Sequence, residues 1–432
     1  MIENPYRPGA GHMPPFLAGR EKEEEHFRKL LRQNFATENI LITGLRGMGK
    51  TVLLAHLKQL AESAGWIWVG NDLSESSSLS EERLALRILT DISESLGRVL
   101  NASEKEQGES TNASFEALRN MYEFTPGLPS DRLRNVLQRL GSLVKSAKAR
   151  GIVLAYDEAQ CLNDRADHNE FPMSMLIETI ASLQRKTGTT QYLLVLCGLP
   201  QTQDALTEAR TYTERMFNVI TLERLSRADT HAAFVTPLKR LMPPLCISRE
   251  LIDKAVDLTH GYPYLIQFFG KELVDELLQN GGTLPVDKFP SSSVLNRLDS
   301  GLFAARWNKT TDKQREVLNI IACRPAESSI DFSAQEIAEQ SVGELTNGQA
   351  TQMLQALTDR GLLYRTRHGR YAFTVPMSEI MILRRMRDVA RVEDSWLMPP
   401  LAHQNGAFSN GTEGNRPEDL PTSRKRWRWL RT

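Results

Sequence analysis

One stretch constrains the fold of this chain more than any other: Gly44-Leu45-Arg46-Gly47-Met48-Gly49-Lys50-Thr51. Residues 39–43 before it are apolar and predict a strand, and a helix is predicted to begin near Lys50. Glycines in such a turn let backbone N–H groups point inward around phosphates, and the helix N-terminus adds the positive end of its dipole. The pattern therefore predicts that residues 44–51, together with Val52, bind a nucleotide. The Lys50 ammonium would reach the β- and γ-phosphates, and the Thr51 hydroxyl would ligate Mg²⁺.

A second motif supplies the acidic half of such a site. Residues 152–156 are apolar apart from a final tyrosine, and they lead directly into Asp157 and Glu158. Asp157 is expected to hold Mg²⁺ through its water shell, and Glu158 to orient and polarise the attacking water. A strand that merely ends in acidic turn residues is the alternative, but the phosphate-binding loop argues against it. The two motifs together predict ATP and Mg²⁺ as cofactors and hydrolysis as the reaction.

The order of elements predicts an α/β fold. Strands are expected at 39–43, 66–70, 152–156 and 192–197, and they alternate with helices, which favours a parallel sheet. Residues 1–225 are predicted to form this core, with 71–150 as a helical insertion. A helical lid is expected at 226–290, a linker around 290–293, and a second compact unit at 300–391. Residues 392–432 are rich in Pro, Gly, Asn and Ser, and near the end in Arg, and predict a disordered basic tail.

Composition narrows the function classes. Lys and Arg number 53, as do Asp and Glu, which excludes a protein uniformly coated in positive charge for nucleic-acid binding. The four cysteines are scattered without a C-x-x-C pair, so neither a disulfide framework nor a zinc site is expected, and a cytoplasmic setting fits best. No apolar run approaches the roughly 18–20 residues of a membrane-spanning helix.

The pairing of the loop with the acidic strand end resembles AAA+ and STAND ATPases, particularly the origin-recognition-like branch. Residues 15–21, which include Arg20, look like the N-terminal box that lines the adenine pocket in that branch. Gly261-Tyr262-Pro263-Tyr264 looks like the G-x-P element of the helical lid, whose proline sits by the adenine or ribose. The resemblance spans about residues 14–390. It implies a P-loop NTPase core, a helical lid and a C-terminal winged helix, and a homo-oligomer in the ATP state.

The sequence also departs from that pattern. Residues 192–197 lead into Gly198 and Leu199, where the family usually carries a polar sensor, so Gln201 or Thr202 is the candidate there. Arg215 lies where the family places its arginine finger, with Arg210 close by, although a surface or salt-bridge arginine is an equal alternative. The usual lid arginine after the G-x-P element is missing, which implies slow or partner-dependent hydrolysis.

The segment after the lid looks like a winged helix. Helices are expected at 312–322, from 334, and at 348–360, and residues 361–364 lead to a hairpin at 365–373. Hydrogen-bonding side chains on the third helix could read base edges in double-stranded DNA, and arginines of the wing could contact phosphates. The helix residues are Gln349, Thr351, Gln352 and Gln355, and the wing residues are Arg365, Arg367 and Arg370. Protein docking or autoinhibition is the alternative for this unit.

These observations lead to one principal hypothesis and two rivals. The principal one is an ATP-dependent molecular switch that binds DNA through the winged helix. A STAND-type signalling or defence ATPase, held inactive by its C-terminal unit until a protein partner arrives, is the first rival. A phosphotransferase with a small-molecule acceptor is the second. The tail at 424–431 alternates cations with aromatic rings and could bind nucleic acid, touch an anionic membrane surface, or remain solvated.

Overall fold

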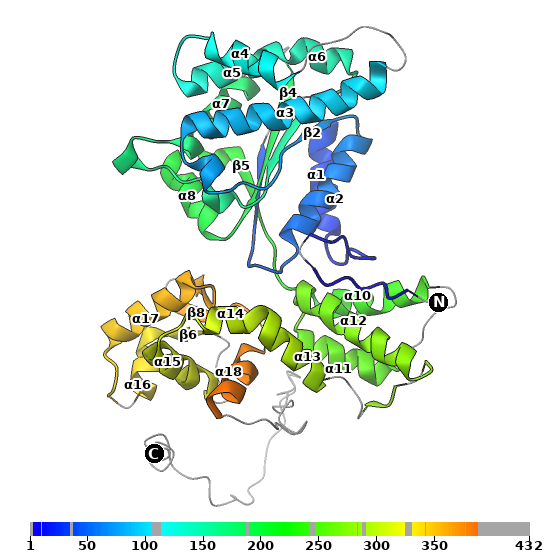
Figure 1. The fold of residues 1–432 in the computed structure, drawn as a ribbon, viewed down its shortest axis with the longest axis vertical. Coiled ribbons are helices and arrows are strands. Elements are labelled where there is room, and N and C mark those ends of the chain that lie inside the picture. The colour runs from blue at the N-terminus through cyan, green and yellow to red at the C-terminus, as the bar shows by residue number, and fades with distance from the viewer. Residues whose placement is uncertain are drawn as a thin grey trace, which may run out of the picture.

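The computed structural model describes residues 3–9, 11–34, 38–104, 114–186, 190–241, 247–282, 284–286, 291–324, 331–341, 343–367, 369–375 and 377–387. The predicted basic tail at 392–432 lies outside these residues. Within them, the chain forms an α/β core, three lid helices and a C-terminal unit (Figure 1).

A five-stranded parallel sheet forms the centre of the core, in the order β2-β3-β4-β1-β5. This confirms the predicted α/β fold with a parallel sheet. The strands are β1 (Asn39–Thr43), β2 (Ile67–Val69), β3 (Gly151–Tyr156), β4 (Gln191–Gly198) and β5 (Phe217–Thr221). The sequence did not predict β5, because this edge strand is short and only partly buried.

Helices cover both faces of the sheet, so every strand residue of β1 and β3 is buried. Alternate residues face opposite layers: Val153 packs on the side of α1 and α2, and Ile152 packs on the opposite side. The first layer contains α1 (Glu21–Arg32) and α2 (Lys50–Ser63). The second contains α3 (Glu81–Glu104), α4 (Phe115–Glu123), α5 (Pro129–Arg139), α6 (Gly141–Ser146), α7 (Pro172–Gln184) and α8 (Gln201–Ala209).

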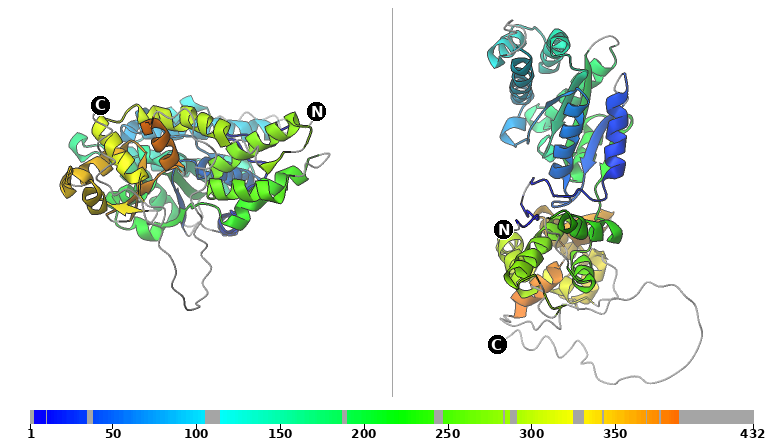
Figure 2. Two further views of the ribbon diagram at one scale, coloured as in Figure 1. Left: turned by 90° about the horizontal axis from the view of Figure 1, so that it is seen from below. Right: turned by 90° about the vertical axis from the view of Figure 1, so that its right-hand side faces the viewer.

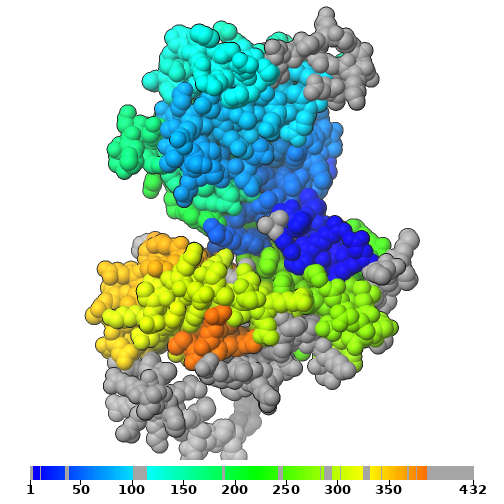
Figure 3. All heavy atoms as spheres, viewed as in Figure 1, coloured from blue at the N-terminus to red at the C-terminus, as the bar shows by residue number. Residues whose placement is uncertain are grey.

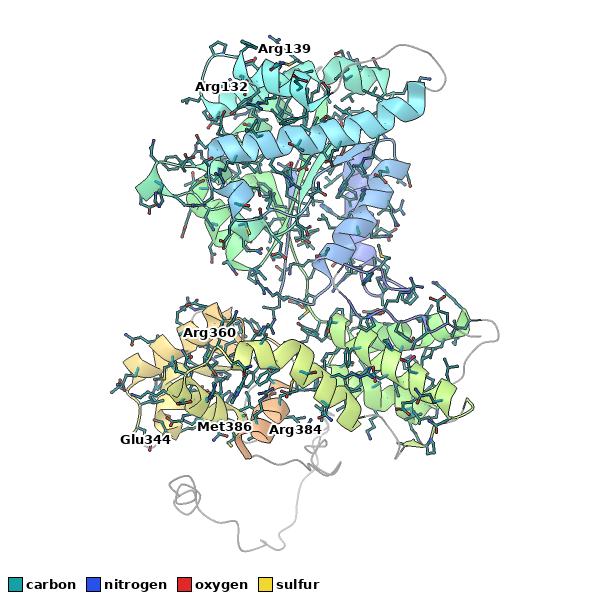
Figure 4. All side chains as sticks on the ribbon, viewed as in Figure 1. Arg132, Arg139, Glu344, Arg360, Arg384 and Met386 are labelled. Atoms are coloured by element: carbon teal, nitrogen blue, oxygen red, sulfur yellow. The ribbon has the colours of Figure 1, made fainter. Side chains whose placement is uncertain are left out.

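The segment predicted as a helical insertion is the connection from β2 to β3. Its helix α3 packs directly on the sheet and shares the second apolar layer with α7. This helix continues to Glu104, so the polar residues 101–104 are helical. Helices α4 and α5, with the labelled Arg132 and Arg139, lie at the end of the core farthest from the lid (Figure 4).

Three helices form the lid: α10 (Arg227–Lys239), α11 (Arg249–Thr259) and α12 (Pro263–Gln279). One stripe of α12 is apolar and packs inward, since Leu265, Phe269, Leu273 and Leu277 recur every four residues and are all buried. Gly281 and Gly282 follow the helix with positive φ angles, as expected of residues that end it.

The predicted linker at 290–293 is wrong from Ser291 onward. The chain there enters a helical path of α13 (Ser291–Leu298), the π-helical turn η5 (Asp299–Phe303) and α14 (Ala304–Trp307). Val294, Leu295 and Leu298 are buried in the main apolar cluster, so burial stabilises a helix where composition indicated a linker. Figure 4 shows Arg384 of α18 beside this path, and its guanidinium donates to Asn296 Oδ1 at 2.7 Å.

The C-terminal unit contains the three predicted helices, α15 (Asp312–Ala322), α16 (Ala334–Gln340) and α17 (Asn347–Asp359), followed by the predicted hairpin of β7 (Leu363–Arg367) and β8 (Arg370–Phe373). The sequence did not predict the short strand β6 (Phe332–Ser333) or the helix α18 (Ser378–Arg387). Capping boxes begin α15, α16 and α17 at Thr311, Ser333 and Thr346. The strands form a small antiparallel sheet in the order β6-β8-β7. That this unit is a winged helix stays a prediction.

The lid and the C-terminal unit lie side by side at one end of the core (Figure 1, Figure 2). Figure 3 shows a narrowing between the core and these two units, with the N-terminal residues in dark blue lying against the lid. Buried residues of all three parts belong to one continuous apolar cluster. None of the helices in the part of the chain that the structure describes is long and apolar enough to cross a membrane.

Candidate active site

The phosphate-binding loop and the acidic pair meet at one edge of the sheet. The loop follows β1, the acids follow β3, and β4 lies between these two strands. Because the strands are parallel, their carboxyl ends share this edge. Thr51 Oγ1 donates a hydrogen bond to Asp157 Oδ2 at 2.5 Å, and the backbone N–H of Glu158 donates to Asp157 Oδ1 at 2.8 Å. The structure thus brings together the two residues predicted to hold Mg²⁺.

The backbone of the loop has the conformation that its glycines permit. Gly47 and Gly49 have φ angles of 83° and 86°, and Gly49 caps the N-terminus of α2. Lys50 Nζ folds back over the loop and donates to the carbonyl oxygens of Gly44 at 3.0 Å and Leu45 at 3.1 Å. Burial lowers the pKa of Lys50, and the negative charge of Asp157 opposes that shift.

A cavity of about 320 Å³ opens at this edge, a volume in the range of a small-ligand site. Most of the predicted cofactor residues line it, as does Glu158; these are Arg20, Arg46, Gly47, Met48, Gly49, Lys50, Thr51, Val52 and Pro263. Gly44, Leu45 and Asp157 do not line it. The N-terminal segment closes one side through Arg7, His12 and Phe16.

Arg20 supports the loop from one side. Its guanidinium donates to the carbonyl oxygens of Met48 at 3.3 Å and Glu223 at 3.1 Å. The residue is buried, and burial lowers the pKa of Arg20. It therefore joins the phosphate-binding loop to the segment that leads from β5 to the lid.

The lid element at 261–264 contacts the loop directly. The Tyr262 hydroxyl donates to the carbonyl of Arg46, and the Tyr264 N–H donates to the carbonyl of Gly47 at 3.3 Å. Burial raises the pKa of Tyr262 to about 12. Pro263 begins α12, where its lack of an N–H costs nothing.

Glu158 is held by a residue that sequence reasoning missed. Gln160 donates from Nε2 to the Glu158 carboxylate, and its Oε1 accepts from the Leu199 N–H at 3.1 Å. A Cβ at Gly198 would lie 3.1 Å from that Oε1, so a glycine there leaves room for the glutamine. No spacing rule indicated Gln160, because it follows β3 while the sensor was expected after β4.

The two residues that the sequence suggested as polar sensors, Gln201 and Thr202, do not face the cavity. Thr202 is fully buried, and among the described residues its hydroxyl has no hydrogen-bond partner. Gln201 is exposed at the start of α8. Neither residue lines the cavity, whereas Gln160 contacts a carboxylate that does.

The two arginine-finger candidates differ in their surroundings. Arg215 is exposed on α9 (Thr213–Met216) and, within the described part of the chain, its guanidinium has no ion pair or hydrogen bond. Arg210 lies 3.5 Å from the Glu178 carboxylate and donates to Ser174 Oγ at 2.9 Å. Arg215 does not line the cavity of its own chain, so as a finger it would act on a neighbouring subunit.

The predicted nucleic-acid residues are unequally available. Gln349 accepts from the Thr346 N–H at 2.9 Å in the cap of α17. Gln352 is exposed, and its side chain makes no hydrogen bond among the described residues. Arg365 lies 5.7 Å over the Tyr371 ring, and its guanidinium donates to Gln355 Oε1. Arg370 pairs with Asp331 at 2.7 Å and also with Glu336, so its guanidinium is already engaged. The side chain of Arg367 lies outside the described part.

The residues present fit a nucleotide with Mg²⁺. The paired oxygens of Thr51 and Asp157 are the hard ligands that Mg²⁺ prefers, and it usually takes few protein ligands besides phosphates and waters. No group of three or more His, Cys, Asp or Glu residues that could hold a metal by themselves occurs in the described ranges.

Comparison with known proteins agrees with this geometry. Residues 17–196 match the AAA ATPase domain, and residues 300–379 match a domain of unknown function (DUF8462). No curated protein matched the sequence.

Two solved structures show the same fold at low sequence identity. The Walker-type ATPase PABY2304 of Pyrococcus abyssi is 16% identical, with a TM-score of 0.57 over 85% of this chain and 96% of that one. The ORC2 protein of Aeropyrum pernix, solved as ADPNP–ADP complexes, is 13% identical, with a TM-score of 0.52 over 88% of this chain and 98% of that one. Residues 17–196 are therefore similar to the AAA ATPase domain, and the fold of the chain is similar to the folds of these two structures.

Proposed function

We propose that this protein is a Mg²⁺-dependent ATPase that works as a molecular switch. The single observation that carries the proposal is the hydrogen bond between Thr51 and Asp157, which places the loop and the acidic strand end at one cavity. When bound, Mg²⁺ would neutralise charge on the β- and γ-phosphates. The loop N–H groups and Lys50 would hold the phosphates, and Arg20 and Pro263 would border the base.

Glu158 would orient the attacking water, since its carboxylate lines the cavity one residue beyond Asp157. Its left-handed backbone, with φ of 55°, is unusual for a residue other than glycine and is often found at functional positions. Gln160 would keep the carboxylate in place. Arg215 would complete the site of an adjacent subunit, which makes a homo-oligomer the active species.

We further propose that the C-terminal unit contacts double-stranded DNA. Exposed Gln352 on α17 and Arg365 on the hairpin support this, because they could reach base edges and phosphates. The absence of a Lys or Arg in α17 limits the contribution of charge from that helix.

A second candidate is a STAND-type ATPase whose C-terminal unit restrains the core until a protein partner binds. Two observations favour it: Arg370 is already paired with carboxylates, and Val375, which follows β8, lines the nucleotide cavity. Stimulation of hydrolysis by a co-purifying protein and not by DNA would distinguish this function from the first.

Calorimetry with Mg-ATP tests the central proposal. The parent protein should bind ATP, and Lys50→Ala should lose most of that affinity. Glu158→Gln should bind ATP and stop turnover, because the water loses its orienting carboxylate. Parent protein that is folded yet takes up no nucleotide would refute the proposal, and turnover by Glu158→Gln at the parent rate would refute the role of Glu158.

A further inference from the structure

A wall of the nucleotide cavity comes from outside the AAA ATPase domain. Arg306, on α14, lines the cavity together with Arg46 and Lys50 of the phosphate-binding loop. It lies within residues 300–379, which match a domain of unknown function, and not within 17–196. The lid positions where the sequence lacks the expected arginine hold Tyr264, Leu265 and Ile266 instead.

The surroundings of Arg306 favour an anion. The residue is half-buried beside Tyr262, and burial lowers its pKa, as does the positive charge of Arg46. Among the described residues its guanidinium has no hydrogen bond and no ion pair. A partly desolvated cation next to a second cation gains most from a negative partner, and a guanidinium suits phosphate oxygens in particular. The cavity beside it is the predicted position of a phosphate chain.

Arg306 is also fixed firmly to the C-terminal unit. The adjacent Trp307 packs on Phe303 with 5.6 Å between ring centroids, and Arg315 of α15 lies 5.4 Å over the Trp307 ring. Arg385 of α18 pairs with Asp299 at 2.7 Å and lies 6.0 Å over the same ring. A displacement of Arg306 would therefore also shift α15 and α18, which contact the same helix.

We propose that Arg306 binds the phosphate chain of the nucleotide within the same polypeptide and thereby couples nucleotide binding to the position of the C-terminal unit. This inference rests on the proposed function. It gives the cavity a phosphate-binding arginine that the lid does not supply. A nucleotide would then hold the C-terminal unit against the core, and loss of its phosphates would release that unit.

Equilibrium binding of Mg-ATP and AMP tests the contact. Arg306→Ala should weaken ATP binding by about tenfold or more, because a charge-assisted hydrogen bond is lost, and should change AMP binding much less. Arg306→Lys keeps the charge and should recover part of the affinity. Arg315→Ala is the control for ATP affinity, since it removes an arginine of the same unit that does not line the cavity.

Hydrogen exchange at saturating ATP tests the coupling. ATP should slow amide exchange in α14, α15 and α18 of the parent protein, but not of Arg306→Ala. Thermal unfolding without nucleotide establishes that each variant is folded, and Arg306→Gln replaces the alanine variant should that one unfold.

The outcomes separate the two proposals. Parent-like ATP affinity in Arg306→Ala, together with loss of binding in Lys50→Ala, would overturn this inference and leave the ATPase intact. Absence of ATP binding by the parent protein would overturn both.

Discussion

Thr51 Oγ1 lies 2.5 Å from Asp157 Oδ2, although 106 positions separate the two residues in the chain. The contact joins the N-terminus of α2 to the carboxyl end of β3 across β4. Both oxygens suit Mg²⁺, so a cation placed there would contact the phosphate-binding loop and the acidic strand end at once.

Asp157→Asn should therefore weaken Mg²⁺ binding and slow ATP hydrolysis. We expect turnover to fall roughly a hundredfold or more, because a bound metal ion stabilises the charge of the transition state by several kcal/mol. Thr51→Ser keeps the hydroxyl and should retain most activity, and chelation by EDTA should stop the parent enzyme. Phosphate release at varied Mg²⁺ measures this, and a parent-like Mg²⁺ dependence in Asp157→Asn would contradict the assignment.

Gln160→Ala should lower the turnover number and leave ATP affinity unchanged. The glutamine holds the Glu158 carboxylate and accepts from the Leu199 N–H, so its loss would disorder the base without touching the phosphate site. We expect a decrease of about tenfold, a part of the roughly 100- to 10,000-fold that a general base usually contributes. Gln201→Ala, on the exposed start of α8, is the control and should behave as the parent does. Equal effects of the two variants would argue against a specific role for Gln160.

Gly47→Ala should weaken nucleotide binding and destabilise the contact between loop and lid. The added methyl group would lie 2.6 Å from the Tyr262 hydroxyl oxygen, and φ of 83° is strained for alanine. We expect a loss of roughly 1–2 kcal/mol in unfolding free energy. Gly348→Ala is the control, because a Cβ there meets open space in a helix and should be neutral or stabilising. Equal unfolding midpoints for the two variants would show that the close approach has no energetic consequence.

Arg215 can be tested by mixing two inactive variants. Arg215→Ala lacks the finger and Lys50→Ala lacks the phosphate site, so neither should turn over ATP well alone. In a mixed oligomer, one subunit could supply Arg215 to the intact cavity of the other, and activity should return and rise with protein concentration. Phosphate release by the mixture measures this. A mixture as inactive as its components would exclude a finger supplied between subunits.

Arg365→Ala and Arg370→Ala should have different effects. Arg365 is exposed, so its loss should weaken DNA binding. The slope of the logarithm of the binding constant against the logarithm of the salt concentration should become shallower by about one. Arg370 is paired with Asp331 and Glu336, so its loss should mainly lower the unfolding midpoint of the C-terminal unit. Gel shifts across a salt series and thermal unfolding measure the two effects. No DNA binding by the parent at low salt, with or without ATP, would favour the protein-binding alternative.

Local patterns account for much of the candidate site. The glycines of the loop, Lys50 and the acids after β3 are recognisable because each follows a short apolar strand, and parallel strands bring such positions to one edge. The apolar stripe of α12 and the capping box at Ser333 are equally readable in the sequence. Gln160 was not, because its partner Leu199 follows a different strand, and β5 was not, because a short edge strand has little apolar periodicity.

The amino-acid order alone determined the α/β class, the position of the phosphate-binding loop and the identity of its acidic partners. These depend on neighbours in sequence: periodicity, turn residues and the end of a strand. Only the tertiary structure decided that the chain is helical from Ser291, that Arg370 forms ion pairs within the C-terminal unit, and that Arg306 lines the cavity. Burial and charge pairing between distant segments set those outcomes, and no local pattern encodes which segments will meet.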